Sequence, residues 1–391
     1  MKKIYLDNAA TTPVSGDVIR EMMPYFSEVY GNSNSLHGFG RESSNAVDKA
    51  RDKIAKCINA GNKEIFFTSG GTEGDNWAIK GIARGNVHRG KHIIVSSIEH
   101  HAVLESCREL ENEGFKVTYL PVDNTGVVSV VDLLHELTPE TTLVSVMAVN
   151  NEVGTIQNIK AIGDLLKDYK TYFHVDAVQA VGCLHIDVKD MKIDAMTMSA
   201  HKIHGPKGVG ALYVRTGVPI KKFMTGGEQE LNRRGGTVNV PGIVGFGKAM
   251  EIAVRDIDVN NKKLEVLTDY FINKITYSIP EIKINGNLHQ KAPGIVNVSF
   301  RYIEGESILI RLDLEGVAVS TGSACASGSL EKSHVLKAMG LSHEDINSAI
   351  RFSFGVDNTK EEIDYVVEKL AIIVADLRKM SPLVKRRSRN V

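Results

Sequence analysis

Lys202 lies at a point in the sequence that suits a lysine to covalent chemistry. It follows the run DAMTMSA, whose small and apolar residues are typical of a buried strand, and it precedes the glycine-rich segment HGPKGVG. A strand end beside a glycine loop lets a ligand approach the backbone closely. A lysine that is partly desolvated there can lose its proton and condense with an aldehyde as a Schiff base. A surface lysine in a turn is the ordinary alternative, so the interpretation depends on the residues around it.

Asp176 and the turn at Gly71 provide two further parts of a cofactor site. Asp176 ends the apolar run YFHVD, and Gln179 follows three residues later. A carboxylate there can pair with a protonated pyridine nitrogen and keep the ring an electron sink, whereas a lone aspartate would more often cap a helix. The stretch EIFFTSGGTEGDN predicts strand, glycine turn and helix, so the amides of Gly71 and Thr72 suit a phosphate. Together with Lys202, these features predict pyridoxal phosphate.

His100 follows another strand-like run, HIIVSS, and could stack on a flat cofactor ring and carry protons. His101 is predicted to begin a helix and to point elsewhere. The pairs His100–His101 and His201–His204 are also compatible with zinc, but neither is accompanied by the glutamate or cysteine ligands of a known zinc motif. No resident metal is therefore expected.

Cys325 lies among small residues in STGSACASGSLEKSH, between a predicted short strand and a helix. Structural cysteines prefer buried apolar settings, so this one is predicted to be a nucleophile, whereas Cys57, Cys107 and Cys183 fit structural roles. Arg351, in the strand-like SAIRFSFG, can form a bidentate pair with a substrate carboxylate; an internal ion pair is the alternative.

The elements that must position these residues follow an α/β pattern. Strand-like runs alternate with amphipathic segments, which predicts a largely parallel sheet covered by helices; the runs are EIFFTS, HIIVSS, KVTYLPV, TTLVSVMAV, YFHVDA, DAMTMSA and GALYV. Ligands bind at the carboxyl ends of such strands. After about residue 260 a long helix, short strands and a closing helix predict a smaller α+β domain. We therefore expect a large domain at 15–260 and a small domain formed by 1–14 and 261–391.

Composition favours small-molecule chemistry. Lys and Arg total 47, as do Asp and Glu, so no global charge would recruit nucleic acid or an acidic membrane. The four cysteines form no CxxC pair, which indicates a reducing compartment. No apolar run is long enough to span a bilayer and none follows the N-terminus as in a signal peptide. A cytoplasmic protein is expected.

Nearly the whole chain resembles the cysteine desulfurases, which are fold-type-I pyridoxal-phosphate enzymes. The motifs that carry the resemblance are YLDNAATTP, SGGTEGDN, SIEHHAVL, NNEVGTIQ, HVDAVQA, SAHKIHGPKGVGAL, RRGGTVNVPGIVG, STGSACASGSLEKSHVLKAMG and IRFSFG. The fold type implies a large domain with a mostly parallel seven-stranded sheet and a smaller α+β domain. Two departures flank the site: Ser33-Asn34, where the family usually has Pro-Ser, and Lys332, where proline is common.

The resemblance implies conversion of L-cysteine to L-alanine, with the sulfur held as a persulfide on Cys325. That sulfur would pass to an iron–sulfur scaffold protein or another acceptor, and Cys325 could contact a cluster briefly during transfer. Its segment resembles the longer, mobile type of this family. For the cofactor, the resemblance implies Lys202 as the lysine that binds it, Asp176 as the partner of the pyridinium nitrogen, His100 as the stacking acid/base, and Gln179 and Asn151 as contacts on the ring hydroxyl side. The implied phosphate contacts are Gly71, Thr72, Ser199 and His201, with Thr237 contributed by the second subunit of a homodimer. For the substrate, the resemblance implies Arg351 as the carboxylate ligand, with Asn151 also nearby.

Two alternatives stay open from the sequence alone. An aminotransferase or selenocysteine lyase on the same scaffold would use Lys202 and Asp176 but leave Cys325 without a role. A non-catalytic scaffold protein with a degenerate cofactor fold is the alternative from outside the enzymes.

Overall fold

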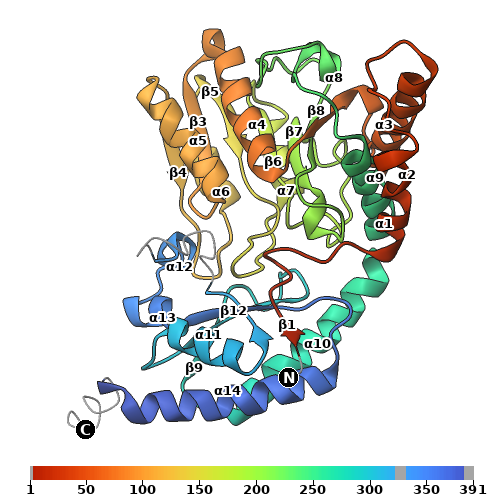
Figure 1. Cartoon of the computed structure of the whole chain (residues 1–391). Helices are drawn as coiled ribbons and strands as arrows, with labels where there is room; N and C mark the ends of the chain where they lie inside the picture. The colour runs from red at the N-terminus through yellow and green to blue at the C-terminus, as the bar shows by residue number, and fades with distance from the viewer. Residues whose placement is uncertain (1–2, 322–331, 383–391) are drawn as a thin grey trace.

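The computed structural model describes residues 3–321 and 332–382. Its centre is a seven-stranded sheet of order β2-β8-β7-β6-β5-β3-β4 (Figure 1). The strands are β2 Ile65–Thr68, β3 His92–Ser96, β4 Lys116–Leu120, β5 Thr141–Ser145, β6 Tyr172–Asp176, β7 Ala195–Ser199 and β8 Gly210–Val214. All neighbouring pairs are parallel except β2–β8 and β7–β8, which are antiparallel. The predicted, mostly parallel sheet of seven strands is confirmed.

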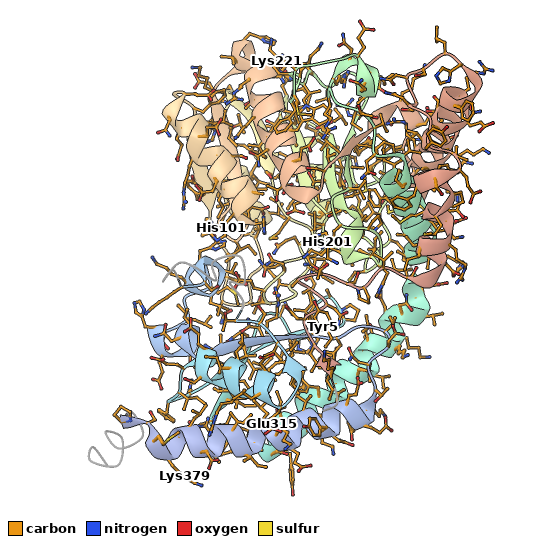
Figure 2. The ribbon with its side chains drawn as sticks, in the orientation of Figure 1. Tyr5, His101, His201, Lys221, Glu315 and Lys379 are labelled. Carbon is orange, nitrogen blue, oxygen red and sulfur yellow. The ribbon has the colours of Figure 1, made fainter. Side chains whose placement is uncertain are left out.

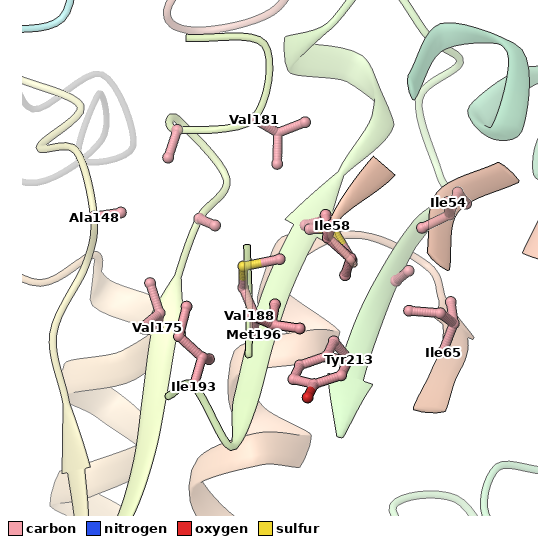
Figure 3. Close-up of a cluster of buried hydrophobic side chains, with 14 of the residues drawn as sticks. Ile54, Ile58, Ile65, Ala148, Val175, Val181, Val188, Ile193, Met196 and Tyr213 are labelled. Atoms are coloured by element: carbon pink, nitrogen blue, oxygen red, sulfur yellow. The ribbon is translucent and has the colours of Figure 1, made fainter. Parts of the chain in front are cut away.

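Alternate residues of each strand face opposite layers, and helices cover both. Phe66, Ile93 and Leu143 belong to one buried cluster, while their neighbours Ile94 and Val144 belong to another. The first cluster includes α4 Gly71–Gly85 and α5 His101–Asn112; the second includes α3 Gly38–Cys57, α6 Val130–Glu136, α7 Ile159–Leu166 and α9 Val240–Arg255. Figure 3 shows part of the second cluster, to which Ile54 and Ile58 of the α3 region contribute together with Met196 and Tyr213. Short helices complete this part: α1 Gly16–Met22, α2 Pro24–Ser27 and α8 Gln229–Asn232.

A smaller sheet lies below the first in Figure 1 and has its own buried cluster. Its antiparallel strands, in the order β12-β10-β9, are β9 Ile282–Asn285, β10 Ile295–Phe300 and β12 Ala349–Ser353. The helices are α10 Ile257–Ser278, α11 Gly305–Leu314, α12 His334–Ala338, α13 His343–Asn347 and α14 Lys360–Met380. The predicted long helix, short strands and closing helix are thus present.

The N-terminal strand joins this smaller part. β1 Ile4–Tyr5 pairs in parallel with β11 Val317–Ala318. Leu6 adds to the same buried cluster as β10 and α14. The chain then runs from β1 toward the large sheet, so residues just after β1 lie between the two sheets (Figure 1).

Candidate active site

A cavity of about 390 Å³ brings together most of the predicted site residues. It is lined by Gly71, Thr72, His100, Asn151, Asp176, Gln179, Ser199, His201, Lys202 and Arg351, together with Ala9, Ala10, Asp75, Met147 and Val178. In Figure 2, His101 and His201 lie in the central region between the two sheets. Thr237 is exposed and does not line the cavity. Cys325 lies outside the described residues.

One end of the cavity has the features of an anion site. Helix α4 begins at Gly71, and its N-cap Gly70 has no side chain to satisfy the first amides. The buried hydroxyl of Ser199 has no hydrogen-bond partner among the described residues. A Cβ atom added at Gly71 would lie 2.8 Å from Cγ2 of Val178, so only glycine fits this turn. Unsatisfied amides and a free hydroxyl suit the phosphate of pyridoxal phosphate.

Lys202 lies in a short 3-10 turn, Ala200–Lys202, directly after β7. Its Nζ atom donates hydrogen bonds to the carbonyls of Ala9 and, at 2.9 Å, Ala10. Gln179 Nε2 donates to the same Ala9 carbonyl at 2.8 Å. The N-terminal segment that contains Ala9 and Ala10 therefore forms one wall of the cavity and holds the amine of Lys202 against it.

Asp176 ends β6 and is buried, with Oδ1 accepting a hydrogen bond from the Val178 amide at 2.9 Å. Burial raises its pKa. Asp75 on α4 is buried beside it, and burial together with the charge of Asp176 raises the pKa of Asp75 well above its usual value. A positively charged group in the cavity, such as a pyridinium, would favour the ionised form of Asp176.

His174, on the same strand as Asp176, lies close to Asp75. Its Nδ1 lies 2.9 Å from the Ser145 hydroxyl and its Nε2 lies 3.0 Å from that of Thr197. Burial lowers the pKa of His174 to about 3, so the ring is neutral. Its 3.7 Å approach to Asp75 Oδ1 is therefore not a salt bridge.

His100 caps α5, and His101 begins that helix as predicted. Burial, together with the charge of Lys202, lowers the pKa of His100 to about 4. A neutral imidazole at the cavity can stack on a flat ring, which fits the predicted role.

Arg351 lies on β12 with 2% of its surface exposed. Its Nη1 donates to the carbonyl of Asn151 and its Nη2 to Oδ1 of Asp7, each at 2.8 Å. Its Nε is buried without a partner in the described structure. The internal ion pair considered as an alternative therefore exists, and the guanidinium still has a donor left for a ligand.

Both described ends of the segment that contains Cys325 are held near the cavity. Ser320 pairs with Arg351 through backbone hydrogen bonds. On the other side, Ser333 caps α12, and its hydroxyl donates to Glu152 Oε2 at 2.6 Å. The segment therefore starts and ends beside residues that adjoin the cavity.

Five residues of the cavity lining were missed from the sequence: Ala9, Ala10, Asp75, Met147 and Val178. Asp75 falls on the apolar face that also includes Ala78, Ile79 and Ile82, and a charge at that spacing could have marked it. Ala9 and Ala10 hold Lys202 through their backbone carbonyls, so their residue types give no signal of this role.

Two further features bear on ligands and membranes. No three His, Cys, Asp or Glu side chains within residues 3–321 and 332–382 are grouped closely enough to hold a metal ion. Over the same ranges, no helix combines the length and the apolar character needed to span a membrane.

Comparison with known proteins agrees with this geometry. The aminotransferase class-V family matches residues 4–366. The cysteine desulfurase IscS of Clostridium botulinum is 53% identical over 384 residues, covering 98% of this chain and 97% of that protein. That of Methanosarcina thermophila is 51% identical over 390 residues, covering 100% and 96%. A solved NifS-like protein, 41% identical, superposes with a TM-score of 0.91 over 96% of this chain and 100% of that one.

The chain therefore belongs to the aminotransferase class-V family. Within it, the full-length relatives confirm the predicted membership of the cysteine desulfurases. Enzymes of this family depend on pyridoxal phosphate, so the predicted cofactor and enzyme class are confirmed as well.

Proposed function

We propose that this chain converts L-cysteine to L-alanine and keeps the sulfur as a persulfide on Cys325 for transfer to an acceptor protein. The observation that carries the proposal is the single cavity lined by Lys202, Asp176, His100 and Arg351, in a chain similar to cysteine desulfurases along its whole length.

The cavity residues fit pyridoxal phosphate at both of its ends. The amides of Gly71 and Thr72, with Ser199 and His201, would hold the phosphate. Asp176 would face the ring nitrogen, and Gln179 and Asn151 the ring hydroxyl side. When bound, the cofactor supplies an aldehyde for the amine of the substrate and a ring that accepts the electron pair released at Cα.

The remaining residues bind the substrate and move protons. Arg351 would hold the carboxylate of L-cysteine, since its Nε is unpartnered. The amine of Lys202 would carry the Cα proton, because it is held at the cavity wall by Ala9 and Ala10. His100 would stack on the ring as a neutral imidazole.

Cys325 would take the sulfur. Its thiolate attacks the substrate sulfur, an S–S bond forms, and the C–S bond of the substrate breaks with its electron pair passing to carbon. The carbon skeleton gains a proton and leaves as alanine. Cys325 is five residues from Ser320, whose backbone pairs with that of Arg351. Five residues span at most roughly 18 Å, so the length of the chain keeps Cys325 within that reach of β12.

The cellular setting proposed is a cytoplasmic homodimer that gives sulfur to an iron–sulfur scaffold protein or another acceptor. Exposure of Thr237 supports its use by a second subunit. The free thiols of Cys57, Cys107 and Cys183 support a reducing compartment. Three of the buried clusters fall almost entirely within one part each, which supports the division into a large domain, 15–260, and a small one, 1–14 with 261–391. A fourth cluster, which includes Met147 and Leu336, packs the two parts together.

The test is to incubate the purified holoenzyme with L-cysteine and a thiol reductant and to measure alanine and sulfide. The proposal expects both products in equal amounts. An aminotransferase would instead yield a keto acid, and a non-catalytic scaffold protein would yield neither product; either result would overturn the proposal.

A further inference from the structure

Asp7 holds the arginine proposed to bind the substrate. Its Oδ1 accepts a hydrogen bond from Arg351 Nη2 at 2.8 Å, and the two side chains form an ion pair. Arg351 is almost fully buried, so an unpaired charge there would be costly. Asp7 itself is not among the residues that line the cavity. Any effect of Asp7 on a ligand in the cavity would therefore pass through Arg351.

The two contacts of the guanidinium leave a defined set of donors. Nη1 is engaged by the Asn151 carbonyl, and Asp7 takes one of the two hydrogens on Nη2. One of the two Nη2 hydrogens lies on the same edge of the planar group as the Nε hydrogen, and Nε has no partner in the described structure. That edge matches the two oxygens of a carboxylate.

The backbone of Asp7 is fixed relative to Arg351. Asp7 forms a bridge with Ser353, two residues beyond Arg351 on β12. The next two amides after Asp7 are engaged too: Asn8 N donates to the Ser353 carbonyl at 3.2 Å, and Ala9 N donates to the Ser353 hydroxyl at 2.9 Å. Neither partner of the ion pair can therefore shift independently.

We propose that Asp7 is a positioning residue for carboxylate recognition: it fixes the rotation of the Arg351 guanidinium so that the Nε edge is kept for the carboxylate of the substrate. This inference rests on the proposed role of Arg351 as the carboxylate ligand. A preorganised donor pair binds more tightly because no ordering is needed when the ligand arrives.

The experiment compares two ligands that differ only in the recognised group. Holoenzyme is titrated with L-alanine, which has the carboxylate, and with L-alaninamide, which has an uncharged amide there, and the change in cofactor absorbance gives each dissociation constant. Asp7→Asn keeps the size of the side chain but removes its charge. A charge-assisted hydrogen bond contributes about 1.5–3 kcal/mol, so the preference for L-alanine should fall at least about tenfold.

Asp345→Asn is the matched control. Asp345 is buried and, like Asp7, is paired with a cation, here Lys283 and Arg301, but it does not line the cavity. The preference of the Asp345→Asn variant for L-alanine over L-alaninamide should stay at the parent value. Asp7→Glu, which keeps the charge, should recover part of the preference lost in Asp7→Asn, and unchanged cofactor absorbance in both variants verifies that they fold.

The outcomes separate the two claims. If Asp7→Asn keeps the parent preference while Arg351→Lys loses it, the inference about Asp7 is wrong and the carboxylate site stands. If Arg351→Lys also keeps the parent preference, the proposed carboxylate site itself is wrong. A stronger preference for L-alanine in Asp7→Asn would show that Asp7 competes with the ligand carboxylate for Arg351. That result would also overturn the inference.

Discussion

The backbone nitrogen of Ala102 donates a hydrogen bond to Nδ1 of His100 at 3.1 Å. Nδ1 can accept that bond only when it carries no proton, so the cap of α5 and the neutral state of the ring depend on each other. The remaining proton of the neutral ring must then lie on Nε2.

His100 is expected to stay neutral throughout the physiological pH range. Burial lowers its pKa to about 4, below the ordinary value near 6.5. The unfolded chain therefore binds more protons between these values, and the contribution of His100 to stability, fully present above about pH 6.5, is lost as the pH falls toward 4. Imidazole nitrogen shifts in labelled protein should show the Nε2–H tautomer down to about pH 5. A titration midpoint near 6.5 would contradict this account.

Glu99 is expected to hold its proton at neutral pH. Its Oε1 accepts hydrogen bonds from the Ser96 hydroxyl at 2.5 Å and the Met147 amide at 2.7 Å, while Oε2 is buried without a partner in the described structure. Burial raises the pKa of Glu99 to about 8. The folded chain then binds more protons than the unfolded chain, so stability falls as the pH rises from about 4.3 to about 8.

Glu99→Gln tests this directly, because an amide keeps the acceptor and cannot ionise. Between pH 6 and pH 9 the free energy of unfolding of the variant should gain about 2–3 kcal/mol relative to the parent. Glu105→Gln, at an exposed position on α5, should show no such gain in denaturant unfolding. Equal pH dependence in Glu99→Gln and the parent would mean that Glu99 is ionised at pH 6.

The sequence predicts the strands of this fold because each is a local run of apolar residues, but the direction of β8 is a tertiary property. Only ten residues separate Ser199 from Gly210, and a parallel return needs a crossover of about a dozen or more. The length of the loop before β8 therefore indicates an antiparallel strand, whereas the residue pattern of β8 does not indicate its direction.

The site divides in a similar way. Asp176, His100 and Ser199 were predictable because the strand ends of an α/β sheet converge at one edge. The Asp7–Arg351 pair joins positions 344 residues apart, and no spacing rule relates them. Glu99 lies next to His100, yet its burial depends on how β5 packs beside it, which the sequence alone does not specify.

Lys202→Ala should give a protein without the visible absorbance of the bound cofactor and without desulfurase activity. Its amine is the one held at the cavity wall by Ala9 and Ala10, and an alanine has no group to form a Schiff base. Lys207→Ala, in the same glycine-rich segment but outside the cavity lining, is the control and should keep both properties. Desulfuration by the Lys202→Ala protein would disprove the assignment.

Thr237 is expected to complete the active site of the other subunit. Thr237→Ala and Lys202→Ala should each be strongly impaired alone. In a mixed dimer of the two variants one site carries both changes and the other carries none, so about half of the activity per dimer should return. Purified mixed dimers, isolated with two different tags, provide the measurement; no recovery would place Thr237 in its own subunit's site or outside any site.

Mass spectrometry of the cysteine peptides after brief exposure of the holoenzyme to L-cysteine tests the central claim most directly. The account predicts one added sulfur on the peptide that contains Cys325 and none on those with Cys57, Cys107 or Cys183, whose thiols have pKa values raised by burial to about 11, 12 and 12. Cys325→Ser should bind the cofactor and L-cysteine but release no alanine. Added sulfur on Cys183, or alanine formed by Cys325→Ser at the parent rate, would contradict the account.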